Sequence, residues 1–241
     1  GASNIIVRVT PEGEMSNTWA NLTAAATIEA ATVLGSGLYV TASNDGIFRF
    51  DLATGGDVAT AQLGSTGEGN LRGIVADGAS GTLLVSSNEG IKRFDPTVSP
   101  MSVSAHSTFE VDPFLSGLGA LARGSDDDLH IFDGLRLWRT SDGDDLIGTS
   151  APTPLLGIYS SASSDGALYW SSELNVAACE HQSGMLMRLI PGVAVEKVAD
   201  GICGPLVDAA PDGRIFGAHA FDGTVSAVDP STGTVTEIVD V

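Results

Sequence analysis

The stretch "GIFRFDLATGG", residues 46 to 56, places one arginine between two phenylalanines and then enters a glycine-containing turn. The stretch "GIKRFDPTVSP", residues 90 to 100, repeats this pattern 44 positions later. Alignment on the arginine reveals further copies: "IIVRVTPEG" (5–13), "LRLWRTSDG" (135–143), "GMLMRLIPG" (184–192) and, with Ala227 in the arginine position, "GTVSAVDPSTG" (223–233). Self-similarity of this kind indicates a repeat fold.

The period of the repeat is long enough for several strands. Successive copies are separated by 41, 44, 46, 49 and 39 residues. A second series of apolar stretches precedes the arginine copies, aligned on Leu38, Leu83, Leu129, Leu168 and Ile215. Dipeptides such as Asp-Gly and Ser-Gly between short β-rich runs are hairpin signals. Each period therefore holds about four short strands and no convincing helix.

Four strands per period of roughly 40 to 50 residues are typical of a β-propeller blade. The sequence predicts an all-β fold in one domain over residues 1–241, a β-propeller of six blades with one incomplete. The alternative is five blades plus an N-terminal hairpin, because the arginine strand occurs six times and the preceding series five times. We expect each arginine to lay its methylenes on a neighbouring side chain and to keep its charged end in water.

Composition excludes several classes of function. Thirty acidic and 11 basic residues give a formal net charge of −19, which argues against a nucleic-acid partner. No apolar run approaches the roughly 20 residues of a membrane helix, so no membrane insertion is expected. The first residues, "GASNIIVRV", have neither a basic nor an apolar signal region, so we expect that a signal peptide is not part of this chain.

Two stretches, "GLYVTASNDGIFRFDLATGG" and "DGRIFGAHAFDGTVSAVDPSTGTVTEIV", resemble blades of the NHL-repeat and gluconolactonase/strictosidine-synthase-like propellers. The resemblance covers nearly the whole chain and is carried by blade-framework residues, which identify a fold more specifically than a function.

A calcium site is what the gluconolactonase-like branch of this resemblance implies, with ligands at the starts of innermost strands. Glu29 and Asn70 occupy comparable positions. The other two places hold apolar residues or residues without a side-chain oxygen: Leu155, Leu156, Gly204 and Pro205. Calcium needs oxygen ligands, so the prediction is no metal and no cofactor, with calcium at Glu29 and Asn70 as the alternative.

The fourth repeat carries about ten extra residues between its second and third strands, within residues 171–184. Insertions in repeat folds map to loops on one face, often the binding face. Glu173, Asn175, Glu180 and His181 of this loop are the predicted ligand- or partner-binding residues. The alternative is that this loop is a tolerated surface insertion without a binding role.

The two cysteines, Cys179 and Cys203, either pair or are both buried as small apolar residues. In a propeller of the resembled kind, their two connections emerge on one face of neighbouring blades, so a disulfide is favoured. A disulfide implies an oxidising compartment, extracellular or periplasmic.

The sequence thus predicts an exported, monomeric binding module without a catalytic site, with a protein or a carbohydrate or other small molecule as partner. The competing prediction is a calcium-dependent lactonase or hydrolase of the gluconolactonase-like type.

Overall fold

The structure is a computed structural model of residues 1–241. It describes residues 5–10, 13–21, 28–42, 46–55, 57–59, 71–87, 90–98, 102–105, 121–123, 128–132, 137–140, 147–149, 162–172, 184–190, 195–202, 206–218 and 223–240. The secondary structure within these ranges consists of strands and turns, and no helix there could cross a membrane.

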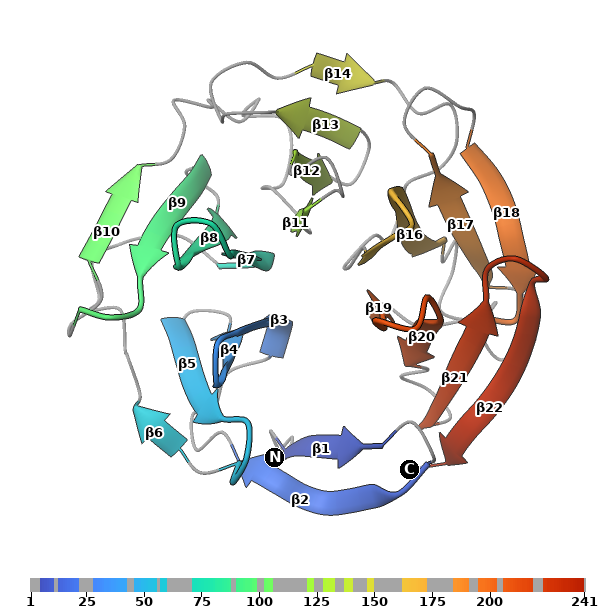
Figure 1. The fold of residues 1–241 in the computed structure, drawn as a ribbon, viewed down its shortest axis with the longest axis horizontal. Helices are drawn as coiled ribbons and strands as arrows, with labels where there is room; N and C mark the ends of the chain where they lie inside the picture. The colour runs from blue at the N-terminus through green and yellow to red at the C-terminus, as the bar shows by residue number, and fades with distance from the viewer. Residues whose placement is uncertain are drawn as a thin grey trace. The chain divides into compact units, whose positions relative to one another are not determined.

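The chain divides into two compact units, one of residues 1–10 and 14–119, the other of residues 11–13 and 120–241. The first unit contains a two-stranded hairpin and two four-stranded sheets (Figure 1). The hairpin is β1 (Ile5–Val9) and β2 (Met15–Asn21); sheet I is β3 (Ile28–Leu34), β4 (Gly37–Ala42), β5 (Gly46–Asp51) and β6 (Asp57–Ala59); sheet II is β7 (Ile74–Asp77), β8 (Thr82–Ser87), β9 (Gly90–Asp95) and β10 (Ser102–Ala105).

The second unit contains three four-stranded sheets. Sheet III is β11 (Leu121–Arg123), β12 (Leu129–Phe132), β13 (Leu137–Thr140) and β14 (Ile147–Thr149); sheet IV is β15 (Ala162–Ser164), β16 (Ala167–Ser172), β17 (Met185–Leu189) and β18 (Val195–Asp200); sheet V is β19 (Leu206–Ala209), β20 (Ile215–Ala218), β21 (Thr224–Asp229) and β22 (Thr234–Asp240). All neighbours within a sheet are antiparallel and follow chain order.

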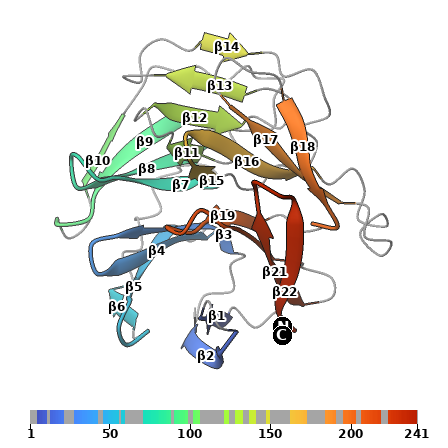
Figure 2. The same ribbon diagram turned by 45° about the vertical axis from the view of Figure 1, so that its right-hand side comes forward.

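Sheets I and IV have apolar residues on both faces, because within its own unit each packs against one neighbour on either side. In sheet I, Phe48 and Phe50 pack toward the β1–β2 hairpin, whereas Tyr39 and Ile47 pack on the opposite face toward sheet II. This confirms that the two phenylalanines of the opening motif share one face. The side-by-side packing of sheets I and II can be followed in Figure 2.

The innermost strands of successive sheets lie next to one another: β3 contacts β7 in the first unit, and β11 contacts β15, which contacts β19, in the second. Polar groups join sheets I and II as well. The buried Thr41 hydroxyl donates to the backbone carbonyl of Arg72 at 2.7 Å, and Thr32 Oγ1 accepts from the Ala76 amide at 3.3 Å. The innermost strands are therefore fixed to each other by hydrogen bonds and by apolar packing.

Two turns with similar sequences contact the outer strand of the preceding sheet. The chain follows β5 with "DLATG" and β21 with "DPSTG", and the last glycine of each turn has a φ of 70°. A Cβ on Gly233 would lie 2.5 Å from the backbone oxygen of Val198 in β18, and one on Gly55 would overlap the backbone oxygen of Trp19 in β2. These turns therefore require glycine for both conformation and space.

Five four-stranded sheets and one two-stranded sheet are thus present in the described part of the chain. This agrees with the predicted repeat, and both predicted descriptions, an incomplete sixth blade and a separate hairpin, are consistent with it. The prediction of one domain over 1–241 stays a prediction.

Candidate functional site

A row of residues crosses each four-stranded sheet at the level of the repeat arginine. The five rows, from innermost to outermost strand, are Thr32–Tyr39–Arg49–Ala59, Val75–Leu84–Arg93–Ser104, Ala122–His130–Arg139–Ile147, Ala162–Tyr169–Arg188–Glu196 and Asp208–Phe216–Ala227–Thr236. Directly opposite residues lie on one face of a sheet, so Arg49 and Arg188 face a tyrosine ring and Arg93 faces a leucine.

In sheet I the arginine binds the ring face. The guanidinium carbon of Arg49 lies 5.9 Å from the centroid of the Tyr39 ring, a cation–π distance. The pair fills the space beside Gly37, where a Cβ would lie 2.8 Å from the ring and 2.9 Å from Arg49 Nε. The charged end therefore does not simply extend into water as expected from the sequence. Arg93 in sheet II instead forms an ion pair with Asp77 at 3.3 Å.

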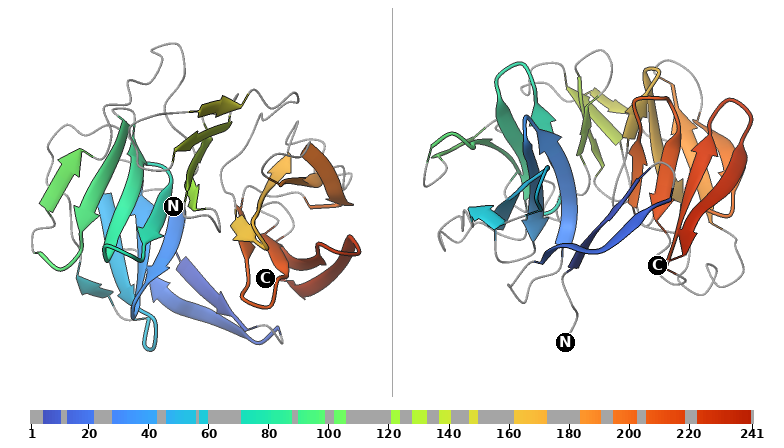
Figure 3. Two further views of the ribbon diagram at one scale, coloured as in Figure 1. Left: turned by 45° about the horizontal axis from the view of Figure 1, so that its top comes forward. Right: turned by 60° about the horizontal axis from the view of Figure 1, so that its bottom comes forward.

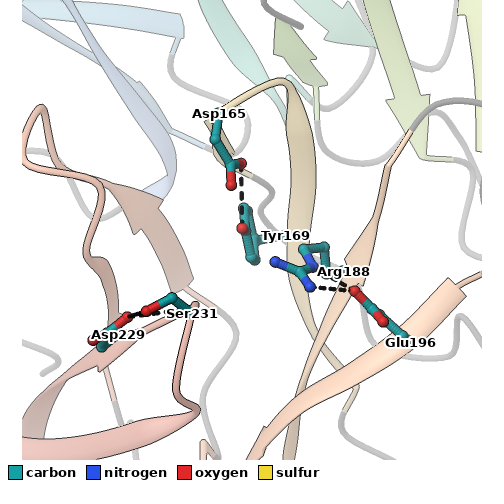
Figure 4. A network of polar contacts seen from close by, with 6 residues as sticks. All are labelled: Asp165, Tyr169, Arg188, Glu196, Asp229 and Ser231. Carbon is teal, nitrogen blue, oxygen red and sulfur yellow. Dashed lines mark hydrogen bonds and ion pairs between the residues drawn. The ribbon is translucent and has the colours of Figure 1, made fainter.

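Sheet IV has a polar network that joins its second, third and fourth strands (Figure 4). The Tyr169 hydroxyl donates to Asp165 Oδ1 at 3.3 Å, and Arg188 Nε donates to Glu196 Oε1 at 2.7 Å. Burial raises the pKa of Tyr169, the Arg188 hydrogen bond opposes that rise, and the Asp165 charge adds to it. Hydrogen bonding to Tyr169 and then to Glu196 raises the pKa of Arg188. At neutral pH the network thus holds a protonated phenol and a charged guanidinium.

Asp165 enters this network from a strained backbone position. Its φ of 51° is the one positive value at a non-glycine residue in the part of the chain that the structure describes. Aspartate tolerates this conformation better than most residues. The "SDG" turn between β15 and β16 therefore places a carboxylate at the phenol of β16.

Sheet V has alanine in the arginine position, and the cation beside its ring comes from the residue just before β20. The guanidinium carbon of Arg214, two residues before Phe216, lies 5.1 Å from the centroid of that ring. Arg214 Nε also donates to Asp212 Oδ2 at 2.8 Å. The ring of sheet V therefore keeps a cation although the repeat arginine is absent.

Asp208, directly opposite Phe216 on innermost strand β19, is a carboxylate in an unusual setting. Its side chain reaches solvent but is surrounded by protein atoms, and this burial raises its pKa. Its Oδ1 accepts one hydrogen bond, from the Ala209 amide at 2.9 Å.

Three aspartates at strand ends have a lowered pKa, in contrast to Asp208. Asp51, Asp95 and Asp229 each accept hydrogen bonds from backbone amides and hydroxyls two or three residues later, which lower their pKa. In Figure 4, Ser231 donates to Asp229 through its hydroxyl, at 2.6 Å. These carboxylates therefore stabilise the turns that follow their strands.

The predicted contact residues Glu173, Asn175, Glu180 and His181 lie outside the described residues, as do Cys179 and Cys203. The binding role of the four and the disulfide therefore stay predictions.

Of the two alternative calcium ligands, Asn70 also lies outside the described ranges. Glu29 lies in β3, half-buried, at a β-bulge between Ile28 and Ala30. Bulges often occur next to active sites, where they redirect a side chain. The donor set is nevertheless unsuited to calcium, because the sequence offers Leu155, Leu156, Gly204 and Pro205 in the remaining places. The described residues contain no group of three or more His, Cys, Asp or Glu side chains arranged for a metal.

No protein-family model matches the chain, and no curated protein matches its sequence. Solved structures do match. A chain of the nidogen/laminin complex aligns with a TM-score of 0.74 at 14% identity, over 97% of this chain and 89% of that chain. The fold is a β-propeller. A gluconolactonase from Xanthomonas campestris aligns with a TM-score of 0.62 at 16% identity, over 90% of this chain and 77% of that chain. Regucalcin, a calcium-binding protein from Agrobacterium tumefaciens, aligns with a TM-score of 0.61 at 18% identity, over 87% of this chain and 73% of that chain.

The predicted resemblance of the propeller framework is thereby confirmed. At these identities the likeness shows the fold alone. The matching propellers differ in function, since one is a chain of a protein–protein complex and another is a lactonase.

Sequence reasoning missed the residues that face the repeat arginines. The signal was present, because the aromatic or leucine of each row follows the aligned residue of the second strand directly, as Tyr39 follows Leu38. Hairpin pairing places these residues opposite the arginine about ten positions later in most repeats.

Proposed function

We propose that this chain is an exported β-propeller module that binds a partner protein with a basic surface, through a surface that includes the 171–184 loop, and that has no catalytic site of its own. The observation that carries this proposal is the formal charge of −19 together with the placement of the cations.

Five cations in the described part of the chain are held by rings or carboxylates of the framework, whereas Arg8 is exposed. Arg49 and Arg214 lie over aromatic rings, and Arg93, Arg188 and Lys197 form ion pairs. Carboxylates exposed to solvent include Asp165, Glu196, Asp200, Asp208, Asp212, Asp229 and Glu237. A surface of this sign attracts a basic partner and accelerates its association.

The fold and the cysteines also support the proposal. The match to a chain of the nidogen/laminin complex shows that a propeller of this size occurs in a protein–protein complex. Export follows from the proposed Cys179–Cys203 disulfide, since such bonds persist in oxidising compartments. Mass spectrometry of the protein isolated without reductant tests this part: two free thiols would contradict it.

Binding to purified extracellular proteins, measured by biolayer interferometry, tests the proposed function. A partner that supports it binds the wild type with an affinity that falls as salt rises, and loses affinity with Glu173→Lys/Glu180→Lys. Glu237→Lys, a charge reversal on an exposed residue of outer strand β22, is the matched control and should change the affinity less. Equal effects of the two charge reversals would contradict a role of the loop.

A calcium-dependent lactonase is the second candidate, favoured by the half-buried Glu29 at its β-bulge. It predicts a large rise in Tm with calcium, reversed by a chelator and abolished by Glu29→Gln, together with hydrolysis of gluconolactone. An unchanged Tm at millimolar calcium and no hydrolysis would exclude this candidate.

A further inference from the structure

The β1–β2 hairpin corresponds to the outer half of a four-stranded sheet. Arg8 of β1 is the repeat arginine, and it is directly opposite Ser16 of β2. In sheets I to IV the strand with this arginine is the third and its later partner is the fourth. The positions of the first and second strands beside β1 hold no strand among the described residues (Figure 3).

The exposure of Arg8 agrees with a missing neighbour. Arg49, Arg93 and Arg188 are half-buried beside the residues opposite them on the second strand, whereas Arg8 is exposed. Arg8 thus has the position of a row arginine without the ring or leucine that the other rows supply.

Part of the inner half of the neighbouring sheet I, on β3 and at Leu38 of β4, is uncovered in the same place. Val33 and Leu38 share the sheet face of Phe50, which is directed toward the β1–β2 hairpin. Val33 is 52% exposed, and Leu38 is only half-buried. Residues in the place of Leu38 in the other sheets are 0–2% exposed: Leu83, Leu129, Leu168 and Ile215.

The next residue along this face shows the same contrast. Ala31 of β3 is exposed, while the residues in its place in sheets II, III and V are buried: Ile74, Leu121 and Val207. The outer half of sheet I is covered normally, since Phe50 is 1% exposed and packs with Ala20 and Trp19 of β2. The uncovered area therefore extends along β3 to Leu38 of β4, while Val40 and Ala42 on the same face of β4 are buried.

The contact between sheets I and II shows which kind of residues cover the corresponding face of sheet II. Sheet II is covered there by Ala30, Leu34 and Tyr39 of the β3–β4 hairpin. We propose that a β-hairpin of a partner polypeptide adds to the edge of β1, covers Ala31, Val33 and Leu38 with apolar residues, and places an aromatic ring opposite Arg8. Edge addition gives affinity through backbone hydrogen bonds and specificity through alternate side chains. This inference rests on the proposed protein-binding function but assigns it a site outside the 171–184 loop.

The probe is a labelled synthetic peptide of residues 28–42, "IEAATVLGSGLYVTA", because this hairpin has the required residues in the required order. Fluorescence anisotropy should show saturable binding to the intact chain. Hydrogen exchange should show slower exchange at the amides of β1. A peptide with Tyr39→Ala should bind at least about tenfold more weakly, since it lacks the ring for Arg8.

Two protein variants test the site, and both change exposed residues so that folding is retained. Arg8→Ala and Val33→Asp should each weaken binding of the peptide about tenfold or more. Val98→Asp is the matched control for Val33→Asp, because Val98 is also exposed, at 45%, and lies in the turn after β9. Thermal unfolding checks that all three variants retain the wild-type fold.

The proposal is wrong if the peptide does not bind, or if Val98→Asp weakens binding as much as Val33→Asp. It is also wrong if light scattering shows a dimer of the unliganded chain that Val33→Asp dissociates, since the occupant would then be a second copy. Failure of peptide binding, with loop-dependent binding of a partner protein retained, would overturn this inference and leave the proposed function standing.

Discussion

The guanidinium carbon of Arg49 lies 5.9 Å from the centroid of the Tyr39 ring, on the strand directly beside its own. The same opposition of strands recurs in every four-stranded sheet, with an arginine on the third strand in four of them. The arginine that marks the period of the sequence therefore also joins the second and third strands of sheet I, through its contact with the tyrosine ring.

Arg49→Ala should lower the free energy of unfolding by about 1–2 kcal/mol, because it removes a cation–π contact and the packing of the arginine methylenes. Arg8→Ala is the control, since Arg8 is exposed and has no opposite ring among the described residues; its effect should stay below about 0.5 kcal/mol. Urea unfolding measures both, and equal effects would contradict a specific role of the ring.

Gly55→Ala should destabilise the protein more than Gly81→Ala, although both glycines have a φ of 70°. A Cβ on Gly81 meets nothing within 4 Å, so its cost is the backbone strain alone, about 1–2 kcal/mol. A Cβ on Gly55 overlaps the Trp19 carbonyl, which adds roughly 1–3 kcal/mol for displaced packing. Thermal unfolding of the two variants separates strain from overlap; an equal loss would show that the hairpin is free to move away.

Tyr169→Phe should lower the free energy of unfolding by about 1 kcal/mol, because it removes the hydroxyl that donates to Asp165 and interacts with Arg188. Tyr39→Phe retains the ring face that Arg49 contacts and should have a smaller effect. Denaturant midpoints compare the two variants. A larger loss for Tyr39→Phe would show that its hydroxyl matters more than the network of sheet IV.

Asp229→Asn should reduce stability at neutral pH and change it little in strong acid. Hydrogen bonds from Ser231 hold the pKa of Asp229 below its ordinary value of 3.8. The native state thus binds the proton less readily than the unfolded chain, so this stabilisation is present above 3.8 and is lost as the pH falls through the lower native pKa. Unfolding curves of wild type and variant, recorded at neutral pH and in acid, should therefore converge in acid; a constant gap would contradict a role of the charge.

Asp208→Asn should raise stability at neutral pH, whereas Asp229→Asn should lower it. Burial raises the pKa of Asp208 above 3.8, so the native state favours its protonated form and ionisation disfavours folding as the pH rises. The variant should be more stable than wild type at neutral pH and should lose this advantage in acid. The pH dependence of Tm measures it, and a less stable variant at neutral pH would show that the carboxylate has a favourable partner in the native state.

The period, the hairpin signals and the arginine alignment predicted the repeating sheets of about four strands. His130, which follows Leu129 as Tyr39 follows Leu38, is likewise buried, at 3% exposed, in β12. Such features depend on local pairing of strands that are close in the sequence, which hairpin spacing determines.

Other features depended on geometry that the alignment does not contain. The cation over Phe216 comes from Arg214, just before β20, whereas the repeat position of sheet V holds Ala227. The uncovered face of β3 follows from which strands are present next to sheet I, and no property of Val33 itself indicates it. The loop residues chosen from the insertion stay predictions, because they lie outside the described part of the chain.

The rows have one further consequence, for the evolution of the chain. In sheet I and in sheet V the ring and its cation belong to the same sheet, and the surfaces between sheets are mainly apolar. A duplicated or deleted blade would thus carry a complete pair with it and leave no orphaned charge behind. Recombination between repeats can therefore change the number of blades without separating these rings from their cations.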